Sequence, residues 1–191
     1  MSLVPNGEFF EIWCKVCKTN QSRLLQYSDN CRDYTSIILK DSNSIINQIE
    51  NILSSQYDLR KYPGEYYYTD AVFCKQIDFV DDLPENLIWK PVTGTWIRKI
   101  RIAFEHENLI DHSYQEIYHL ATLDAETKVL VTYPKEGVSL EQHINGFDKI
   151  IQQFDARSKP FLIIFGCYNK STESFDWVGY ELKKDKEPCP Y

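Results

Sequence analysis

The sequence predicts a single α/β domain in which a mixed β-sheet is covered by helices on both faces. Two observations support this fold class. Segments with apolar residues at helical spacing alternate with short runs rich in β-branched and aromatic residues. No linker, repeat or low-complexity segment divides the 191 residues, and a chain of this length buries roughly 70% of the surface of its unfolded form. We therefore expect one core.

The expected elements run in the order helices, hairpin, long strand, helix, strand, helix and two strands. Helical spacing marks residues 8–18, 40–57, 111–123 and 139–156. The second of these carries the clearest apolar stripe, and Asp41 or Ser42 is expected to cap it. Strand patterns mark residues 65–79, 95–108, 127–134, 160–169 and 175–184. This order gives a helical N-terminal extension over about residues 1–40, a core over about 42–182 and a loose tail over 183–191.

Composition and charge restrict where the protein acts. No window approaches the roughly 20 apolar residues that cross a bilayer, and the first residues lack the pattern of a signal peptide, so a cytoplasmic protein without membrane contact is expected. The formal charge of −7 means that nucleic acid must bind to a local basic patch. Arg98, Lys99 and Arg101 in "WIRKIR" form the best candidate for that patch.

Six cysteines are too few for a disulfide scaffold in a chain of this length. Cys14 and Cys17 form the single C-x-x-C motif, and no second pair completes a zinc site. We expect reduced cysteines, with this pair helping to bury one face of a short helix.

Acidic residues interrupt two of the predicted strands. Asp70 lies within the apolar and aromatic run "YYYTDAVFC", and Glu105 and Glu107 share one face of the long strand. Two carboxylates about 6 Å apart repel by roughly 3 kcal/mol at an effective dielectric constant near 20. If these acids converge, a divalent ion is the simplest compensation, and oxygen ligands favour Mg²⁺ or Mn²⁺. The alternative is a solvated Glu-x-Glu pair on an edge strand.

This arrangement resembles the PD-(D/E)xK nuclease superfamily, which has the restriction-endonuclease-like fold. The resemblance covers about residues 42–182 and rests on Asp70 in "YTDAVF" and on Glu105 and Glu107 in "AFEHEN", followed by a helix and a buried strand. It implies that Asp70 and Glu105 hold the metal and that all three acids are catalytic. Thr69 stands where the family has proline, and Glu107 stands where it has lysine, a variant that some restriction endonucleases share.

The resemblance also implies a second group of candidate residues. Glu50 matches the acid that the family's opening helix often supplies. Gln115 and His119 lie one turn apart on the helix after the motif and are candidates to reach the metal's waters or a phosphate, although a solvated helix face explains them as well. His106 lies on the opposite strand face from Glu105, which favours a place in the core.

The function implied is Mg²⁺-dependent or Mn²⁺-dependent hydrolysis of nucleic-acid phosphodiester bonds, as in a DNA endonuclease. Cleavage of both DNA strands would favour a homodimer. The alternative is a nuclease-like fold that serves as a catalytically inactive binding or interaction module, which the acidic charge and the missing lysine favour. A third hypothesis is an unrelated α/β protein whose acids are scattered over the surface.

Overall fold

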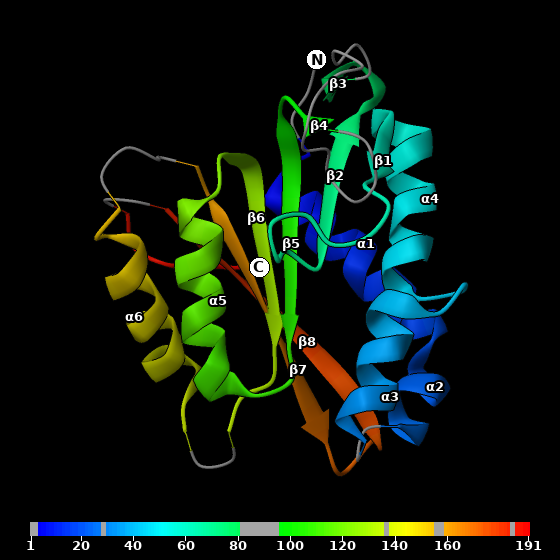
Figure 1. Cartoon of the computed structure of the whole chain (residues 1–191). Coiled ribbons are helices and arrows are strands. Elements are labelled where there is room, and N and C mark those ends of the chain that lie inside the picture. Colours follow the sequence, from blue (N-terminus) through cyan, green and yellow to red (C-terminus); the bar gives the residue numbers. More distant parts are fainter. Residues whose placement is uncertain (1–3, 28–29, 81–95, 136–137, 155–158, 184–185) are drawn as a thin grey trace.

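A computed structural model of the whole chain describes residues 4–27, 30–80, 96–135, 138–154, 159–183 and 186–191. Its centre is a seven-stranded mixed sheet in the order β1-β2-β5-β6-β7-β8-β9 (Figure 1). β5, β6 and β7 are parallel, whereas the other neighbouring pairs are antiparallel. The strands of this sheet are Leu59–Lys61, Ala71–Lys75, Ile100–Glu107, Ala125–Thr132, Phe161–Asn169, Ser174–Leu182 and Cys189–Pro190. β3 (Phe79–Val80) and β4 (Trp96–Ile97) pair separately.

Helices cover both faces of the sheet, as the sequence predicts (Figure 1). One face carries the helices of the first part of the chain, and the other carries α5 and α6. The first group comprises α1 (Asn6–Thr19), α2 (Gln21–Gln26), α3 (Cys31–Thr35), the π-helix η1 (Ser36–Lys40) and α4 (Ile45–Tyr57). The second group comprises α5 (Ile110–Thr122) and α6 (Leu140–Ile151), and a 3-10 turn, η2 (Gln76–Asp78), follows β2.

The N-terminal helices are part of the core. Phe9 and Trp13 of α1 are fully buried, and both rings contact the ring of Phe104 on β5. Cys14 and Cys17 also face this core, and burial raises the pKa of both thiols. The apolar face of α1 therefore cannot leave the sheet without exposing large aromatic side chains.

Several boundaries differ from the sequence-based expectation. α4 is capped by Ser44, whose hydroxyl accepts from Asn47 N, and not by Asp41 or Ser42, so residues 41–44 separate it from η1. The strand expected over residues 65–79 is broken, because a tight turn over Tyr66–Thr69 precedes β2 and the 3-10 turn η2 separates β2 from β3. A loose tail is expected over residues 183–191, but Cys189–Pro190 pair with β8, and Tyr191 stacks on Phe10 of α1.

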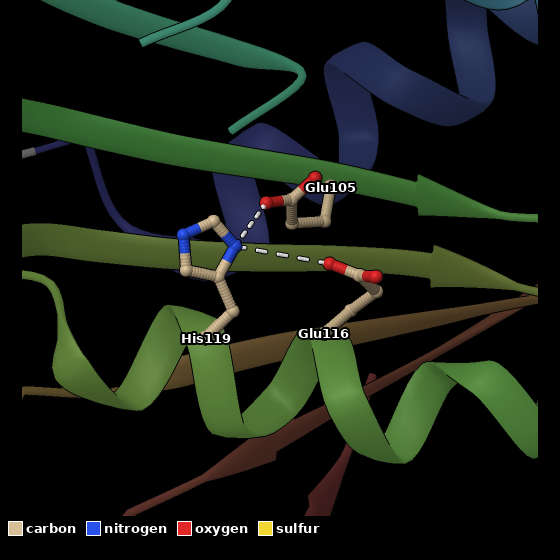
Figure 2. A group of neighbouring side chains, drawn as sticks. All are labelled: Glu105, Glu116 and His119. Carbon is tan, nitrogen blue, oxygen red and sulfur yellow. Dashed lines mark ion pairs between the residues drawn. The ribbon is translucent and has the colours of Figure 1, made fainter. Parts of the chain in front are cut away.

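Alternation along β5 decides which side chains face which helical layer. Ile102 and Phe104 belong to the cluster under α1 and α4, whereas Ala103 belongs to the cluster under α5 and α6. Glu105 continues the Ala103 face and is directed toward α5, as Figure 2 shows. No helix in the described part of the chain is long and apolar enough to span a membrane.

Candidate metal centre

Two of the predicted acids meet where the start of β2 approaches β5. The backbone N–H of Asp70 donates to Oε2 of Glu105 at 3.2 Å, and the backbone N–H of His106 donates to Oδ2 of Asp70 at 2.9 Å. The register Ala71↔Phe104 places Asp70 beside Glu105 across this antiparallel pair. The convergence thus follows from strand pairing, because each carboxylate accepts from the backbone of the opposite strand.

The helix α5 adds two further side chains to this acidic pair. Nδ1 of His119 lies 3.0 Å from Oε1 of Glu105 and 3.8 Å from Oε2 of Glu116 (Figure 2). One potential ligand atom from each of these three residues lies within 4.8 Å of the other two. Glu116 and His119 are three residues apart, so both side chains project from the same face of α5 toward β5. We call Glu105, Glu116 and His119 the Glu-Glu-His group.

The outer nitrogen of His119 has a backbone acceptor. Nε2 lies 2.8 Å from the backbone carbonyl of Tyr67. A carbonyl oxygen can only accept, so Nε2 carries the hydrogen and the neutral ring presents a lone pair at Nδ1. This lone pair faces the Glu105 carboxyl group. A proton on Nδ1, a proton on the Glu105 carboxyl group or a metal ion must lie between the two. Donation of the second ring N–H to a backbone carbonyl is the usual arrangement of a metal-binding histidine.

Burial disfavours the charged forms of the carboxyl groups at the centre. The Glu105 side chain is nearly enclosed, with 3% of the residue exposed. Oε1 has no hydrogen-bond partner within the described residues, although Nδ1 of His119 lies 3.0 Å from it. Burial, followed by the nearby Asp70 and Glu116 carboxylates, raises the pKa of Glu105. Burial also raises the pKa of Asp70 and of Glu116. A bound divalent ion would remove this penalty by neutralising the carboxylates.

The other predicted acids lie outside the Glu-Glu-His group. Glu107 accepts from the backbone N–H of Leu109 at 2.7 Å and so supports the start of α5. It remains close enough to raise the pKa of Glu116. Glu50 is on α4, across the sheet, where its Oε1 accepts from Lys61 N of β1 at 2.9 Å. Gln115 is exposed on α5 and is not part of the group.

His106 occupies the core position expected from its strand face. Nε2 lies 3.0 Å from the hydroxyl of Tyr133, and the ring stacks on Tyr34. Burial lowers the pKa of His106 to about 3, so the ring stays neutral at physiological pH. His106 therefore supports packing on the face opposite the centre.

The predicted basic patch is largely engaged in ion pairs. Arg101 makes two contacts to the Asp78 carboxylate, at 2.7 and 2.8 Å, and a third to Glu126 at 3.1 Å. Lys99 also pairs with Glu126. Arg98 is exposed, and its backbone N–H donates to the Asp78 carbonyl. The strand therefore presents much less free positive charge than its sequence indicates.

Glu116 is the residue that the sequence-based reasoning missed. The signal lay in the spacing Glu116-x-x-His119, which places a carboxylate and an imidazole on one helix face. The sequence-based interpretation pairs His119 with Gln115, whose side chain projects about 100° around the helix from that of Glu116. A choice between the two required knowledge of the direction from which β5 approaches the helix.

No protein-family model matches this chain, and comparisons with curated proteins and with solved structures give no match either. The fold and the site define a mixed α/β protein with a candidate cation-binding group between β5 and α5.

Proposed function

We propose that this protein is a metal-dependent nuclease that hydrolyses nucleic-acid phosphodiester bonds, with DNA as the expected substrate. The observation that carries this proposal is the buried Oε1 atom of Glu105, which faces His119 and Glu116 without a hydrogen-bond donor. The order of the elements supports it. Asp70 precedes the second strand of the sheet, Glu105 is on the third, and α5 and the buried strand β6 follow. This is the order that the resemblance to PD-(D/E)xK nucleases implies.

The donor set fits a divalent ion held by Glu105, with Asp70, Glu116 and His119 as the further candidates. Carboxylate oxygens suit both Mg²⁺ and Mn²⁺, whereas an imidazole nitrogen is a better ligand for Mn²⁺ or a later transition metal. The sequence alone indicates oxygen ligands only. With His119 in the group, we expect Mn²⁺ to bind more tightly than Mg²⁺.

The chain's own side chains fit the needs of phosphodiester hydrolysis. A bound divalent ion would polarise the phosphate and lower the pKa of a bound water. Asp70, whose carboxylate accepts from His106 N, is held next to Glu105 and would add negative charge beside a bound ion. Glu107 is the proposed proton acceptor, because one of its oxygens is left over after the bond to Leu109 N.

The lysine on β6 does not take the place of the lysine in the PD-(D/E)xK motif. Lys128 is buried on the neighbouring strand, but its Nζ donates to the Ala121 carbonyl at 3.4 Å and lies over the ring of Phe161. We therefore propose that the positive charge that stabilises the transition state comes mainly from the ion. This makes strict metal dependence part of the proposal.

The test is cleavage of plasmid, linear duplex and single-stranded DNA at low salt in Mg²⁺, in Mn²⁺ and in chelator. The wild type should cleave at least one substrate with a metal and none with chelator. Glu105→Gln and Asp70→Asn should lower the rate at least about 100-fold, whereas Gln115→Ala should not change it. A wild type that cleaves none of these substrates in either metal contradicts the proposal. If duplex is cut in both strands, sedimentation should reveal a homodimer.

A binding or interaction module without catalysis is the second candidate function. The engagement of Lys99 and Arg101 by Glu126 and Asp78, together with the acidic net charge, favours it. In that case Mn²⁺ should give no binding heat in calorimetry, and Asp70→Asn should leave partner binding unchanged. The cleavage series and the calorimetry together separate the two candidates.

A further inference from the structure

The turn over Tyr66–Thr69 has an unusual backbone for its residues. Tyr66 N donates to the Thr69 carbonyl at 3.2 Å, and Thr69 N donates to the Tyr66 carbonyl at 3.0 Å, which closes a two-residue hairpin. The two central residues, Tyr67 and Tyr68, have φ values of 50° and 64°. Such turns strongly prefer Asn-Gly, because residues with a bulky side chain are strained in the left-handed region. The sequence places the least suitable side chains at both positions.

Neither tyrosine is required by the core. Tyr67 is 57% exposed and Tyr68 is 87% exposed. The ring of Tyr67 packs edge to face with the ring of Tyr66. Stability is lowered both by the strained backbone and by the exposure of two large aromatic rings to solvent. Strain of this kind is retained where it serves a function, so the rings themselves require an explanation.

The turn is connected directly to the candidate metal centre. The Tyr67 carbonyl accepts from Nε2 of His119 at 2.8 Å, and the chain then passes through Thr69 to Asp70. Both the imidazole and a carboxylate of the centre therefore depend on the position of this turn. The backbone of the turn that carries Tyr67 and Tyr68 therefore borders the centre.

We infer that Tyr67 and Tyr68 form a stacking platform for unpaired bases, so that the centre acts on single-stranded nucleic acid or on an unpaired end. This inference rests on the proposed function. Bases of a single strand offer their faces to aromatic side chains, whereas in a duplex these faces are covered by neighbouring base pairs. Stacking is also the form of nucleic-acid contact that needs the fewest cations, and Lys99 and Arg101 are already paired with acids.

The variant Tyr68→Gly tests the stacking platform, because it should change stability and nucleic-acid binding in opposite directions. Glycine adopts a positive φ without strain, so this variant should raise Tm by about 2–4 °C. It also removes a stacking surface and should weaken binding of a labelled oligothymidine about 5- to 100-fold. Tyr68→Phe keeps the ring and should bind nearly as the wild type does. Tyr168→Ala, which removes a half-exposed tyrosine from β7, is the matched control and should bind unchanged.

Binding is measured by fluorescence anisotropy at low salt in Ca²⁺, with the oligothymidine alone and annealed to oligoadenosine. The wild type should bind the single strand at least about 10-fold more tightly than the duplex. Equal affinity for the two forms, or unchanged single-strand affinity in Tyr68→Gly, overturns the platform. Tight single-strand binding without cleavage in Mn²⁺ leaves the platform standing and overturns the nuclease. Metal-dependent cleavage with a preference for duplex supports the nuclease and overturns the platform.

Discussion

Nδ1 of His119 lies 3.0 Å from Oε1 of Glu105, while Nε2 of the same ring is held by the Tyr67 carbonyl at 2.8 Å. The ring is thus fixed between a backbone acceptor on one side and a buried carboxyl group on the other. The hydrogen on Nε2 leaves Nδ1 free to bind a cation, and Glu116 approaches the same atom at 3.8 Å. This arrangement gives the candidate centre a nitrogen ligand that an all-carboxylate site lacks.

The first prediction concerns the metal preference that His119 confers. His119→Ala should weaken Mn²⁺ binding at least about 10-fold and should weaken Mg²⁺ binding much less, because Mg²⁺ gains little from an imidazole ligand. Calorimetric titration with each metal measures both affinities. Gln115→Ala, an exposed change one turn away on α5, is the control and should retain wild-type affinities. An unchanged ratio of the two affinities in His119→Ala would show that His119 is not a ligand.

The second prediction follows from the raised pKa of Glu105. Without metal, the unfolded chain loses the Glu105 proton near its ordinary pKa of about 4.3, whereas the folded chain holds it to a higher pH, about 9. Between these values the folded state binds more protons, so the free energy of unfolding falls by up to about 1.4 kcal/mol for each pH unit. Glu105→Gln removes this term. Its stability relative to the wild type should rise from pH 5 to pH 8, as measured by urea unfolding in chelator.

A control for that experiment is the addition of Mn²⁺ to the wild type. The ion competes with the proton, so it should raise Tm more at pH 8 than at pH 5. Glu105→Gln should show a much smaller increase at either pH. If the two proteins have parallel stability profiles from pH 5 to pH 8, Glu105 is ionised in the folded state and the electrostatic account of the centre is wrong.

The third prediction concerns the lowered pKa of His106, which follows Glu105 on β5 and faces the opposite helical layer. Burial lowers the pKa of His106 to about 3, whereas the unfolded histidine takes up a proton near pH 6.5. The unfolded state therefore binds more protons between these values, and this contribution to stability is lost as the pH falls below about 6.5. His106→Gln should be less stable than the wild type at pH 7, since packing against Tyr34 is lost. The difference should shrink at pH 5, and urea unfolding at the two pH values measures it. A difference that does not shrink would mean that the folded protein admits the charged ring.

The layout of the strands was accessible from the sequence because burial leaves a clear pattern. β7 begins with an apolar run and β6 carries one over residues 129–131, as expected for strands covered on both faces. Alternation along β5 separates Glu105 from His106. Asp70 was conspicuous because a carboxylate is unusual within an aromatic and aliphatic stretch. These signals depend on local periodicity and need no knowledge of the partner elements.

What the sequence could not reveal depends on contacts between distant elements. The choice of Glu116 over Gln115 depends on how α5 is rotated over β5, and a difference of one residue on a helix turns a side chain by about 100°. Tyr67 contacts His119 through its backbone carbonyl, and the type of side chain does not indicate such a contact. The pairing of Arg101 with Asp78 joins β5 to η2 and removed a residue from the predicted basic patch.

The fourth prediction separates structural from binding arginines in that patch. Arg101→Met leaves the nearly buried Asp78 carboxylate without its partner, whose hydrogen bonds lower the Asp78 pKa, and should destabilise the fold by about 3 kcal/mol. If Arg101 does not bind phosphate, the slope of log affinity against log salt for oligonucleotide binding should stay unchanged. Arg98→Ala removes an exposed charge and should leave stability unchanged while reducing that slope by about 1. Urea unfolding and anisotropy at several salt concentrations measure both quantities. A reduced slope in Arg101→Met at a temperature where the variant is folded would mean that Arg101 contacts the nucleic acid despite its ion pairs.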